Sequence, residues 1–253
     1  MRLTPPILKE IKRNFEKAKM IQYIKPDKTI GEIIESKRGN SRYAWKEEMK
    51  LKNYRKSFLN GAADKTILFC TLTIPHKNSF WGCKNSWDYI SKALSPFTKA
   101  LKKMGLEKYV VTLEATYKGA CHAHLISRWD KPFQTRKVKG KFYPTDKKLV
   151  KKIRDKWLKE WQKEYPHIPI KKQIHLQVCP DLIEAENTFN YATKFTGKGS
   201  NIETALFNAE RGNASEKEVA KLLTNYWGMK LKIRSYRTSK NLGKNTPSFD
   251  LRE

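Results

Sequence analysis

Residues 108–129, KYVVTLEATYKGACHAHLISRW, contain two runs rich in apolar and β-branched residues, separated by the short segment YKG. This pattern predicts two antiparallel strands, 108–116 and 120–129, each buried on one face only. A three-residue loop with glycine in the left-handed region is a common hairpin connection, and Gly119 suits that position. The hairpin therefore requires a sheet with one face packed against a core.

The same loop predicts which residues face each other across the hairpin. Glu114 falls opposite His122, and Thr112 falls opposite His124. Because strand side chains alternate between faces, both histidines and Glu114 share the face that does not point into the core. Two imidazoles and a carboxylate with open coordination positions are typical of a catalytic metal site. The alternative is a pair of surface histidines with Glu114 as an ion-pair partner.

Other segments extend the hairpin into an α+β domain. Strands are predicted at 65–75 and 172–180, and helices at 86–105, 146–165 and 181–197. This order predicts a central antiparallel sheet with helices on one face. We predict three parts, which are a basic N-terminal extension at 1–62, the α+β domain at 63–200, and a basic C-terminal region at 201–253. The last part should hold a helix near 215–226, then a strand or hairpin within NYWGMKLKIRSYRTSK and a tail.

Charge restricts the partners of this chain. It has 53 Lys and Arg residues against 25 Asp and Glu residues, a formal net charge of +28. Such an excess favours a polyanion as partner, with nucleic acid ahead of a membrane. No apolar run reaches the roughly 20 residues of a membrane span, and the first residues lack the apolar core of a signal peptide. We therefore expect a cytoplasmic protein, with its four cysteines reduced because none forms a C-x-x-C pair.

Further polar residues lie on the predicted helix 181–197 and around it. Tyr191 and Lys194 are three residues apart and share a helix face. His175 and Gln177 alternate onto the non-core face of their strand, and Lys198 follows the helix as a candidate phosphate contact. The alternatives are packing for the tyrosine and solvent exposure for the others.

Three motifs, in this order, resemble those of the HUH endonuclease superfamily. Within it they look like those of rolling-circle replication initiators (Rep proteins) of plasmids and small single-stranded DNA phages. The motifs are LFCTLTIP with Thr71 and Thr73, CHAHLI with His122 and His124, and YATK with Tyr191 and Lys194. The tyrosine follows the histidines, as in Rep proteins, whereas relaxases have the opposite order. Phe195 stands where two-tyrosine phage initiators carry a second tyrosine, so the chain resembles the single-tyrosine class. The resemblance covers residues 65–200.

The resemblance implies a ferredoxin-like, RRM-like HUH fold and a metal-dependent endonuclease that nicks and later rejoins single-stranded DNA at an origin. It implies that Glu114, His122 and His124 hold Mg²⁺ or Mn²⁺. Tyr191 would attack the phosphodiester, leaving a 5′-phosphotyrosine and a free 3′-OH, while Lys194 would stabilise the developing charge. In the family the first motif is a strand beside the metal site, which here carries Thr71 and Thr73. Together with His175, Gln177 and Lys198, noted above for their positions, they are the candidate DNA-binding residues. The implied partners are an origin hairpin and a host helicase and polymerase, and a homodimer is left open.

Two rival functions share parts of this pattern. An HUH-type single-tyrosine transposase would use the same chemistry on different DNA. A non-catalytic single-stranded nucleic-acid-binding protein would share the charge but would not need the histidines and the tyrosine together. A hydrolase of the His-x-His-x-Asp-His type is excluded because Ile126 stands at the aspartate position.

Overall fold

The computed structural model describes most of the chain. The described residues are 3–24, 30–35, 41–74, 76, 79–163, 174–193, 202–231, 233, 236–240 and 242. The helices are α1 (Pro5–Lys19), α2 (Ser41–Leu59), α3 (Phe80–Lys102), α4 (Lys147–Gln162), α5 (Leu182–Thr193), α6 (Ile202–Glu210) and α7 (Glu216–Lys230). The strands are β1 (Met20–Ile24), β2 (Ile30–Glu35), β3 (Thr66–Thr73), β4 (Leu106–Ala115), β5 (Cys121–Trp129), β6 (Thr135–Val138), β7 (Lys141–Pro144), β8 (Ile174–Cys179) and β9 (Tyr236–Thr238).

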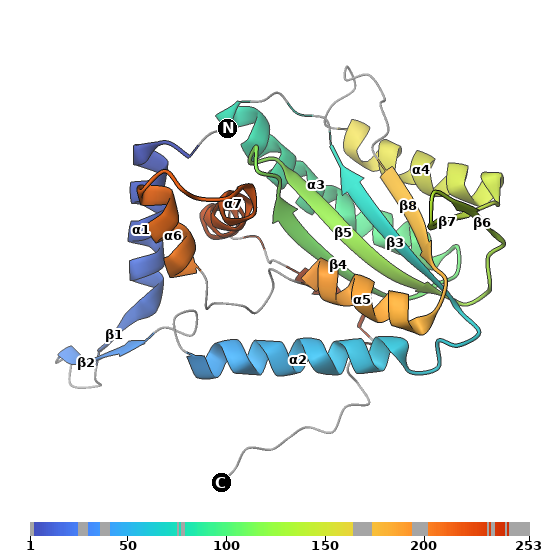
Figure 1. Ribbon diagram of the computed structural model, residues 1–253, viewed down its shortest axis with the longest axis horizontal. Helices are drawn as coiled ribbons and strands as arrows, with labels where there is room; N and C mark the ends of the chain where they lie inside the picture. The colour runs from blue at the N-terminus through green and yellow to red at the C-terminus, as the bar shows by residue number, and fades with distance from the viewer. Residues whose placement is uncertain are drawn as a thin grey trace, which may run out of the picture.

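Seven of these strands form one antiparallel sheet in the order β6-β7-β8-β3-β5-β4-β9 (Figure 1). The predicted α+β class with a central antiparallel sheet is confirmed. β3 pairs with β5 on one side and β8 on the other, and β5 pairs in turn with β4. The histidine hairpin therefore lies inside the sheet, with neighbours that hold both of its strands in register.

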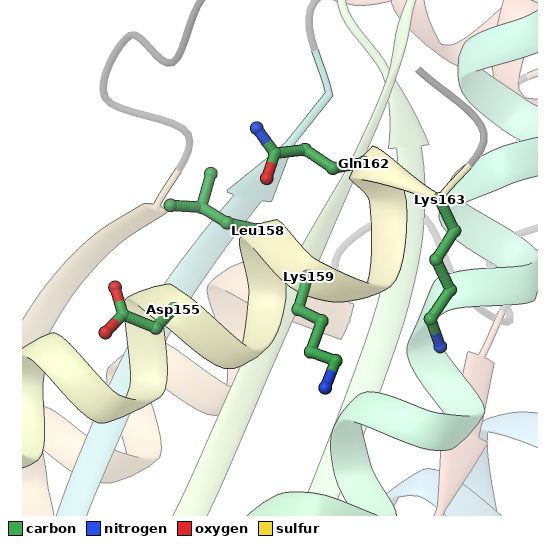
Figure 2. A pocket seen from close by; sticks show the side chains of 5 residues that line it. All are labelled: Asp155, Leu158, Lys159, Gln162 and Lys163. Atoms are coloured by element: carbon green, nitrogen blue, oxygen red, sulfur yellow. The ribbon is translucent and has the colours of Figure 1, made fainter. Parts of the chain in front are cut away.

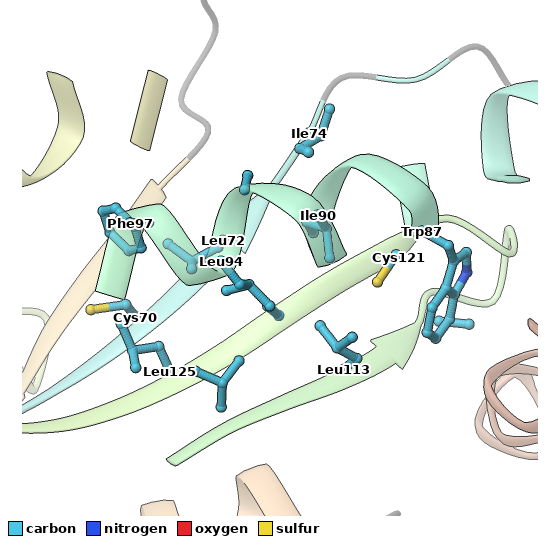
Figure 3. Packing of buried hydrophobic residues seen from close by; sticks show 14 of the residues in the cluster. Cys70, Leu72, Ile74, Trp87, Ile90, Leu94, Phe97, Leu113, Cys121 and Leu125 are labelled. Carbon is cyan, nitrogen blue, oxygen red and sulfur yellow. The ribbon is translucent and has the colours of Figure 1, made fainter. Parts of the chain in front are cut away.

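One face of the sheet carries the main hydrophobic core. Alternate residues of β3, among them Cys70 and Leu72, pack against Trp87 and Phe97 of α3 (Figure 3). α4 joins this core through one face, because the side chains of Trp157 and Trp161 are fully buried in the same cluster. Burial of large aromatic side chains contributes most per residue to such a core. This face is the one that the sequence pattern assigned to packing.

Helices also pack on the second face, so they are not confined to one face as predicted. Ala185, Phe189 and Ala192 of α5 join a second cluster with Val110 and Ile126 of the hairpin strands. The physical reason lies in the face of the sheet that carries Glu114, His122 and His124, here called the histidine face. This face is apolar at one end, at Val110 and Ile126, and polar at the other. α5 covers the apolar end, which leaves the polar end beside its last turn.

Parts of both predicted extensions contact the sheet domain. Ile11 of α1 is fully buried in the main core, and Phe58 of α2 is buried in the second cluster. At the other end of the chain, β9 pairs with β4 along Val110–Thr112. The domain boundaries near 62 and 200 stay predictions, but each flanking region contributes residues to the common cores.

Two predicted elements were wrong in detail. The helix predicted to begin at Ser86 begins at Phe80, because Ser79 accepts the N-cap hydrogen bond from Gly82 at 3.0 Å. The segment NYWGMK, expected in a strand or hairpin, belongs to α7. Tyr226 and Trp227 are fully buried there, so tertiary packing outweighs the β propensity of aromatic residues.

Arg128 links α2 to the sheet, and its loss should be costly. The side chain is buried, donates to both Glu107 carboxylate oxygens, and also donates to the carbonyls of Phe58 and Asn60. We expect Arg128→Ala to lower the free energy of unfolding by about 3 kcal/mol, because it empties a buried site and leaves the buried Phe58 carbonyl and the partly exposed Glu107 without their donor. Urea denaturation measures the change. Arg55→Ala is the control, since the Arg55 ion pair with Glu186 is half-exposed and should contribute about 1 kcal/mol at most. Equal losses in the two variants would contradict the prediction.

Candidate metal centre

The β4–β5 hairpin has the register that its sequence predicts. Glu114 pairs with His122 and Thr112 pairs with His124. The loop closes with a hydrogen bond from the Gly119 amide to the Thr116 carbonyl at 2.8 Å, and Gly119 has a φ of 88°. Only glycine adopts this backbone conformation without strain, so the YKG loop sets the register that brings the three polar side chains together.

The side chains of Glu114, His122 and His124 converge on one point. Both imidazole Nε2 atoms lie 2.8 Å from the same carboxylate oxygen, Oε1 of Glu114. The three candidate ligand atoms all lie within 4.8 Å of one another. Glu114 and His124 are buried, whereas His122 is partly exposed. This cluster could hold a metal ion with an approach from the His122 side.

The electrostatics of the cluster favour an ionised carboxylate. Burial by itself would raise the pKa of Glu114, but hydrogen bonds from His122 and His124 outweigh it and hold the pKa well below its usual range. An anionic oxygen next to two imidazole nitrogens is a donor set that divalent cations accept. The residues present therefore fit a metal ion, because they offer charge neutralisation and ligands of suitable type at one place.

β3 orients the inner histidine. Thr71 lies opposite His124 in the sheet, and its hydroxyl is 3.3 Å from His124 Nδ1. The Phe69 ring stacks on the same imidazole with centroids 5.3 Å apart. A hydrogen bond at Nδ1 directs Nε2 toward the carboxylate, as outer partners do in metal sites. Thr71 thus lies beside the cluster.

Tyr191 of α5 lies over this cluster. Its ring meets His124 at a centroid distance of 5.6 Å and Phe69 at 6.1 Å, both edge to face. The side chain is 49% exposed, so it is open to a large ligand. The fold therefore brings Tyr191 to His124, although the two residues are far apart in sequence.

A buried hydrogen bond attaches the end of α5 to the hairpin. The Thr112 hydroxyl donates to the Ala192 carbonyl at 2.7 Å, next to Tyr191 in the chain. Thr112 itself lies opposite His124. Thr112 therefore contacts both the strand that carries the histidines and the helix α5 that carries Tyr191. The hydrogen bond to Ala192 fixes the distance of Tyr191 from the sheet.

Thr112→Val should loosen α5 without emptying the core. The variant keeps the volume of the side chain but leaves the Ala192 carbonyl without its donor, which costs about 1–2 kcal/mol. Amide hydrogen exchange of α5 should therefore accelerate roughly 5–30-fold if it proceeds by undocking of the helix. Thr193→Val is a matched control, since the Thr193 hydroxyl bonds within α5 to Phe189. Faster exchange of equal size in both variants would contradict the role given to Thr112.

The remaining predicted residues divide into two groups. Thr73 lies opposite His122, and His175 lies opposite Thr71, so both extend the histidine face. Gln177 lies opposite Phe69 on the same face. Burial lowers the pKa of His175, and the nearby charges of Lys141 and Arg154 lower it further. Lys194 and Lys198 lie outside the described residues.

Phe69 and Thr112 contribute to the site but were not predicted as functional residues. Phe69 contacts both His124 and Tyr191, and Thr112 bonds to the tyrosine helix. Strand alternation carried the signal, because Phe69 shares a face with Thr71, and Thr112 shares one with Glu114. Strand alternation does not predict where α5 packs, and the position of α5 is what gives Phe69 and Thr112 their roles.

The pocket on α4 is separate from this cluster. It is lined by Asp155, Leu158, Lys159, Gln162 and Lys163, and none of the three ligand residues takes part (Figure 2). Within the described part of the chain, the histidine cluster is the one group of three or more candidate ligands that could hold a metal ion. No described helix is both long and apolar enough to cross a membrane.

Fold and site together define an α+β protein with a candidate metal centre of two histidines and a glutamate on the open part of its sheet, beside a half-exposed tyrosine. Comparison of the chain with protein-family models, curated proteins and solved structures finds no match. Its chemistry is therefore inferred from the site itself.

Proposed function

We propose that this protein is a rolling-circle replication initiator that nicks single-stranded DNA by attack of Tyr191 on a phosphodiester. The observation that carries the proposal is the position of Tyr191 over His124, half-exposed and beside the candidate metal ligands. The net charge of +28 supports a DNA substrate. The motif order noted in the sequence, with the tyrosine after the histidines, agrees with this class.

The chemistry requires a nucleophile and charge neutralisation at one phosphate. The Tyr191 hydroxyl gives up its proton and its oxygen forms a bond to phosphorus, while the bond from phosphorus to the 3′ oxygen breaks and that oxygen takes up a proton. The products are a 5′-phosphotyrosine and a free 3′-OH, and attack of that hydroxyl on the phosphotyrosine reverses the reaction. Phenols are weak nucleophiles at neutral pH, so such a tyrosine needs assistance.

The metal centre fits this need. Mg²⁺ or Mn²⁺ bound by Glu114, His122 and His124 would polarise the scissile phosphate and neutralise its charge. The chain's own part is positioning: Thr71 and Phe69 hold the His124 ring, and α5 holds Tyr191 next to it. A binding protein without catalysis would not require a tyrosine at the ligands. That geometry therefore favours a nuclease over a passive binder.

The decisive experiment looks for a covalent protein–DNA adduct. Wild-type protein is incubated with single-stranded oligonucleotides drawn from the DNA that flanks its gene, with Mn²⁺ or with chelator, and resolved under denaturing conditions. We expect an adduct with Mn²⁺ that carries a 3′ label but not a 5′ label, and none with chelator. Mass spectrometry of digested adduct should place the nucleotide on Tyr191. Cleavage without any adduct, or an adduct on another residue, would refute the proposal.

The DNA sequence that is cut decides between the initiator and a transposase of the same chemistry. Cleavage at a replication origin supports the initiator, whereas cleavage at the ends of a mobile element would assign the protein to the transposases.

A further inference from the structure

The hairpin formed by β6 and β7 lies at the edge of the sheet beside α4 (Figure 1). Val138 pairs with Lys141, so the connection is the two-residue turn formed by Lys139 and Gly140. Both turn residues have positive φ, 49° at Lys139 and 78° at Gly140. Asn or Gly is usual at the first position of such a turn, because a lysine there is strained. The tip of the hairpin therefore presents a lysine at a cost in stability.

The hairpin and the helix after it carry a concentrated positive charge. Between residues 131 and 160 there are twelve Lys and Arg residues and three acidic ones, and no acidic residue lies between 131 and 145. Arg136, Lys139 and Lys141 are exposed. Within the described residues, none of these three forms an ion pair with an acidic side chain. Such a surface is arranged for an anionic partner and not for internal pairing.

This basic hairpin is continuous with the face of the metal centre. Arg136 pairs with Tyr143, so both project from one side of the hairpin. The Tyr143 ring meets His175 at a centroid distance of 6.0 Å, edge to face, and His175 lies opposite Thr71 beside His124. Neighbouring strands lie roughly 4.8 Å apart, so β7 is roughly 15 Å from β5. A DNA molecule engaged at the cluster would reach the hairpin within a few nucleotides.

We propose that the β6–β7 hairpin binds the phosphate backbone and major groove of a DNA duplex that adjoins the single strand at the metal centre. The inference rests on the proposed function, which supplies DNA as the anion at that face. The major groove of B-form DNA is wide enough to admit a two-stranded β-ribbon. Exposed cations on the two strands and at the tip of such a ribbon match the phosphates that border the groove.

The side chains of the hairpin favour a duplex over a single strand. Binding of a single strand depends on aromatic side chains that stack on unpaired bases. The two aromatic residues here are only partly exposed and already engaged, Phe142 beneath the Lys137 ammonium and Tyr143 against His175. The fully exposed positions offer charge without a stacking surface. A duplex requires only the positive charge, because its bases are already stacked on one another.

The test compares two variants that each lose one arginine and two lysines. The hairpin variant is Arg136→Gln, Lys139→Gln and Lys141→Gln. The control is Lys9→Gln, Arg211→Gln and Lys217→Gln, three exposed positions on or next to α1, α6 and α7, on the other side of the molecule (Figure 1). Affinity is measured in chelator, as a function of salt, for a DNA duplex of about 20 base pairs, which spans two helical turns. The separate strand and an RNA duplex of equal length are measured alongside.

We expect wild-type protein and the control to bind the DNA duplex with equal salt dependence. Each phosphate contact contributes about 0.9 to the slope of log affinity against log salt, so the hairpin variant should lose up to about 2.7 of it. Over the one decade between 1 M and 0.1 M salt, that slope corresponds to a loss of duplex affinity of up to roughly 500-fold at 0.1 M. Since chelator is present and binding is scored, absence of nicking would not affect this result, and the two proposals can fail separately.

Three outcomes would overturn the inference. One is a hairpin variant whose duplex affinity and salt slope equal those of the control. The second is an equal loss of single-strand binding, which would assign the surface to unpaired DNA. The third is equally tight binding of the RNA duplex by wild-type protein, because the deep, narrow major groove of A-form RNA does not admit a ribbon.

Discussion

Protein with phenylalanine in place of Tyr191 is expected to form no covalent adduct with DNA. The substitution removes the oxygen that would bond to phosphorus and keeps the ring that packs on His124 and Phe69. Loss of a catalytic nucleophile typically reduces turnover by more than roughly 10,000-fold. Because the side chain is half-exposed, the variant should fold with a stability within about 0.5 kcal/mol of wild type. Denaturing gels of the labelled adduct measure the first effect, and urea denaturation measures the second.

The matched control for this experiment is Tyr117→Phe. Tyr117 lies in the loop between β4 and β5 and is 46% exposed, similar to Tyr191, and the ammonium of the neighbouring Lys118 lies over its ring. This control should keep wild-type adduct formation. Adduct formation by Tyr191→Phe at the wild-type rate would remove Tyr191 as nucleophile and leave the metal centre without the role proposed for it.

Substitution of His122 by alanine should remove the response of the protein to Mn²⁺. His122 supplies one of the three candidate ligand atoms, and its side chain is more exposed than that of His124, so the cavity cost is smaller. A ligand at 100 times its dissociation constant stabilises the folded state by about 2.7 kcal/mol. For a chain of this size that corresponds to a rise in melting temperature of roughly 5–10 °C. Wild type should show the rise, and His122→Ala should not.

Two further measurements separate metal binding from general damage to the fold. His76→Ala removes a histidine outside the cluster and should retain the full rise with Mn²⁺. Loss of a residue that only hydrogen-bonds to a metal ligand typically reduces activity roughly 10–100-fold. Nicking by His122→Ala should fall by more than this, because the variant loses a ligand itself. An unchanged response of His122→Ala to Mn²⁺ would show that the ion binds elsewhere.

The metal cluster is the part of the site that sequence predicted best. Glu114 and both histidines belong to one hairpin, so their proximity depends on strand alternation and on a loop that requires glycine. Both requirements are local. The register that follows from them, with Glu114 opposite His122, is the register in the structure.

Elements that depend on distant packing were predicted less well. The β6–β7 hairpin was not predicted, because β6 is exposed along its whole length and neither strand carries an apolar alternation. The position of α5 was predicted incompletely, because its amphipathic pattern does not say which face of the sheet it meets. Val110 and Ile126 decide this, since they make the histidine face apolar where α5 packs.

By itself, then, the sequence determined a hairpin that carries two imidazoles and a carboxylate on one face. Hydrogen bonding between adjacent strands fixes that arrangement wherever the hairpin lies. Only the tertiary structure decided that Tyr191 meets His124, because that contact needs α5 to pack on the second cluster and to accept the Thr112 hydrogen bond. Contacts between segments far apart in the chain depend on the packing of the whole domain, which no local pattern contains.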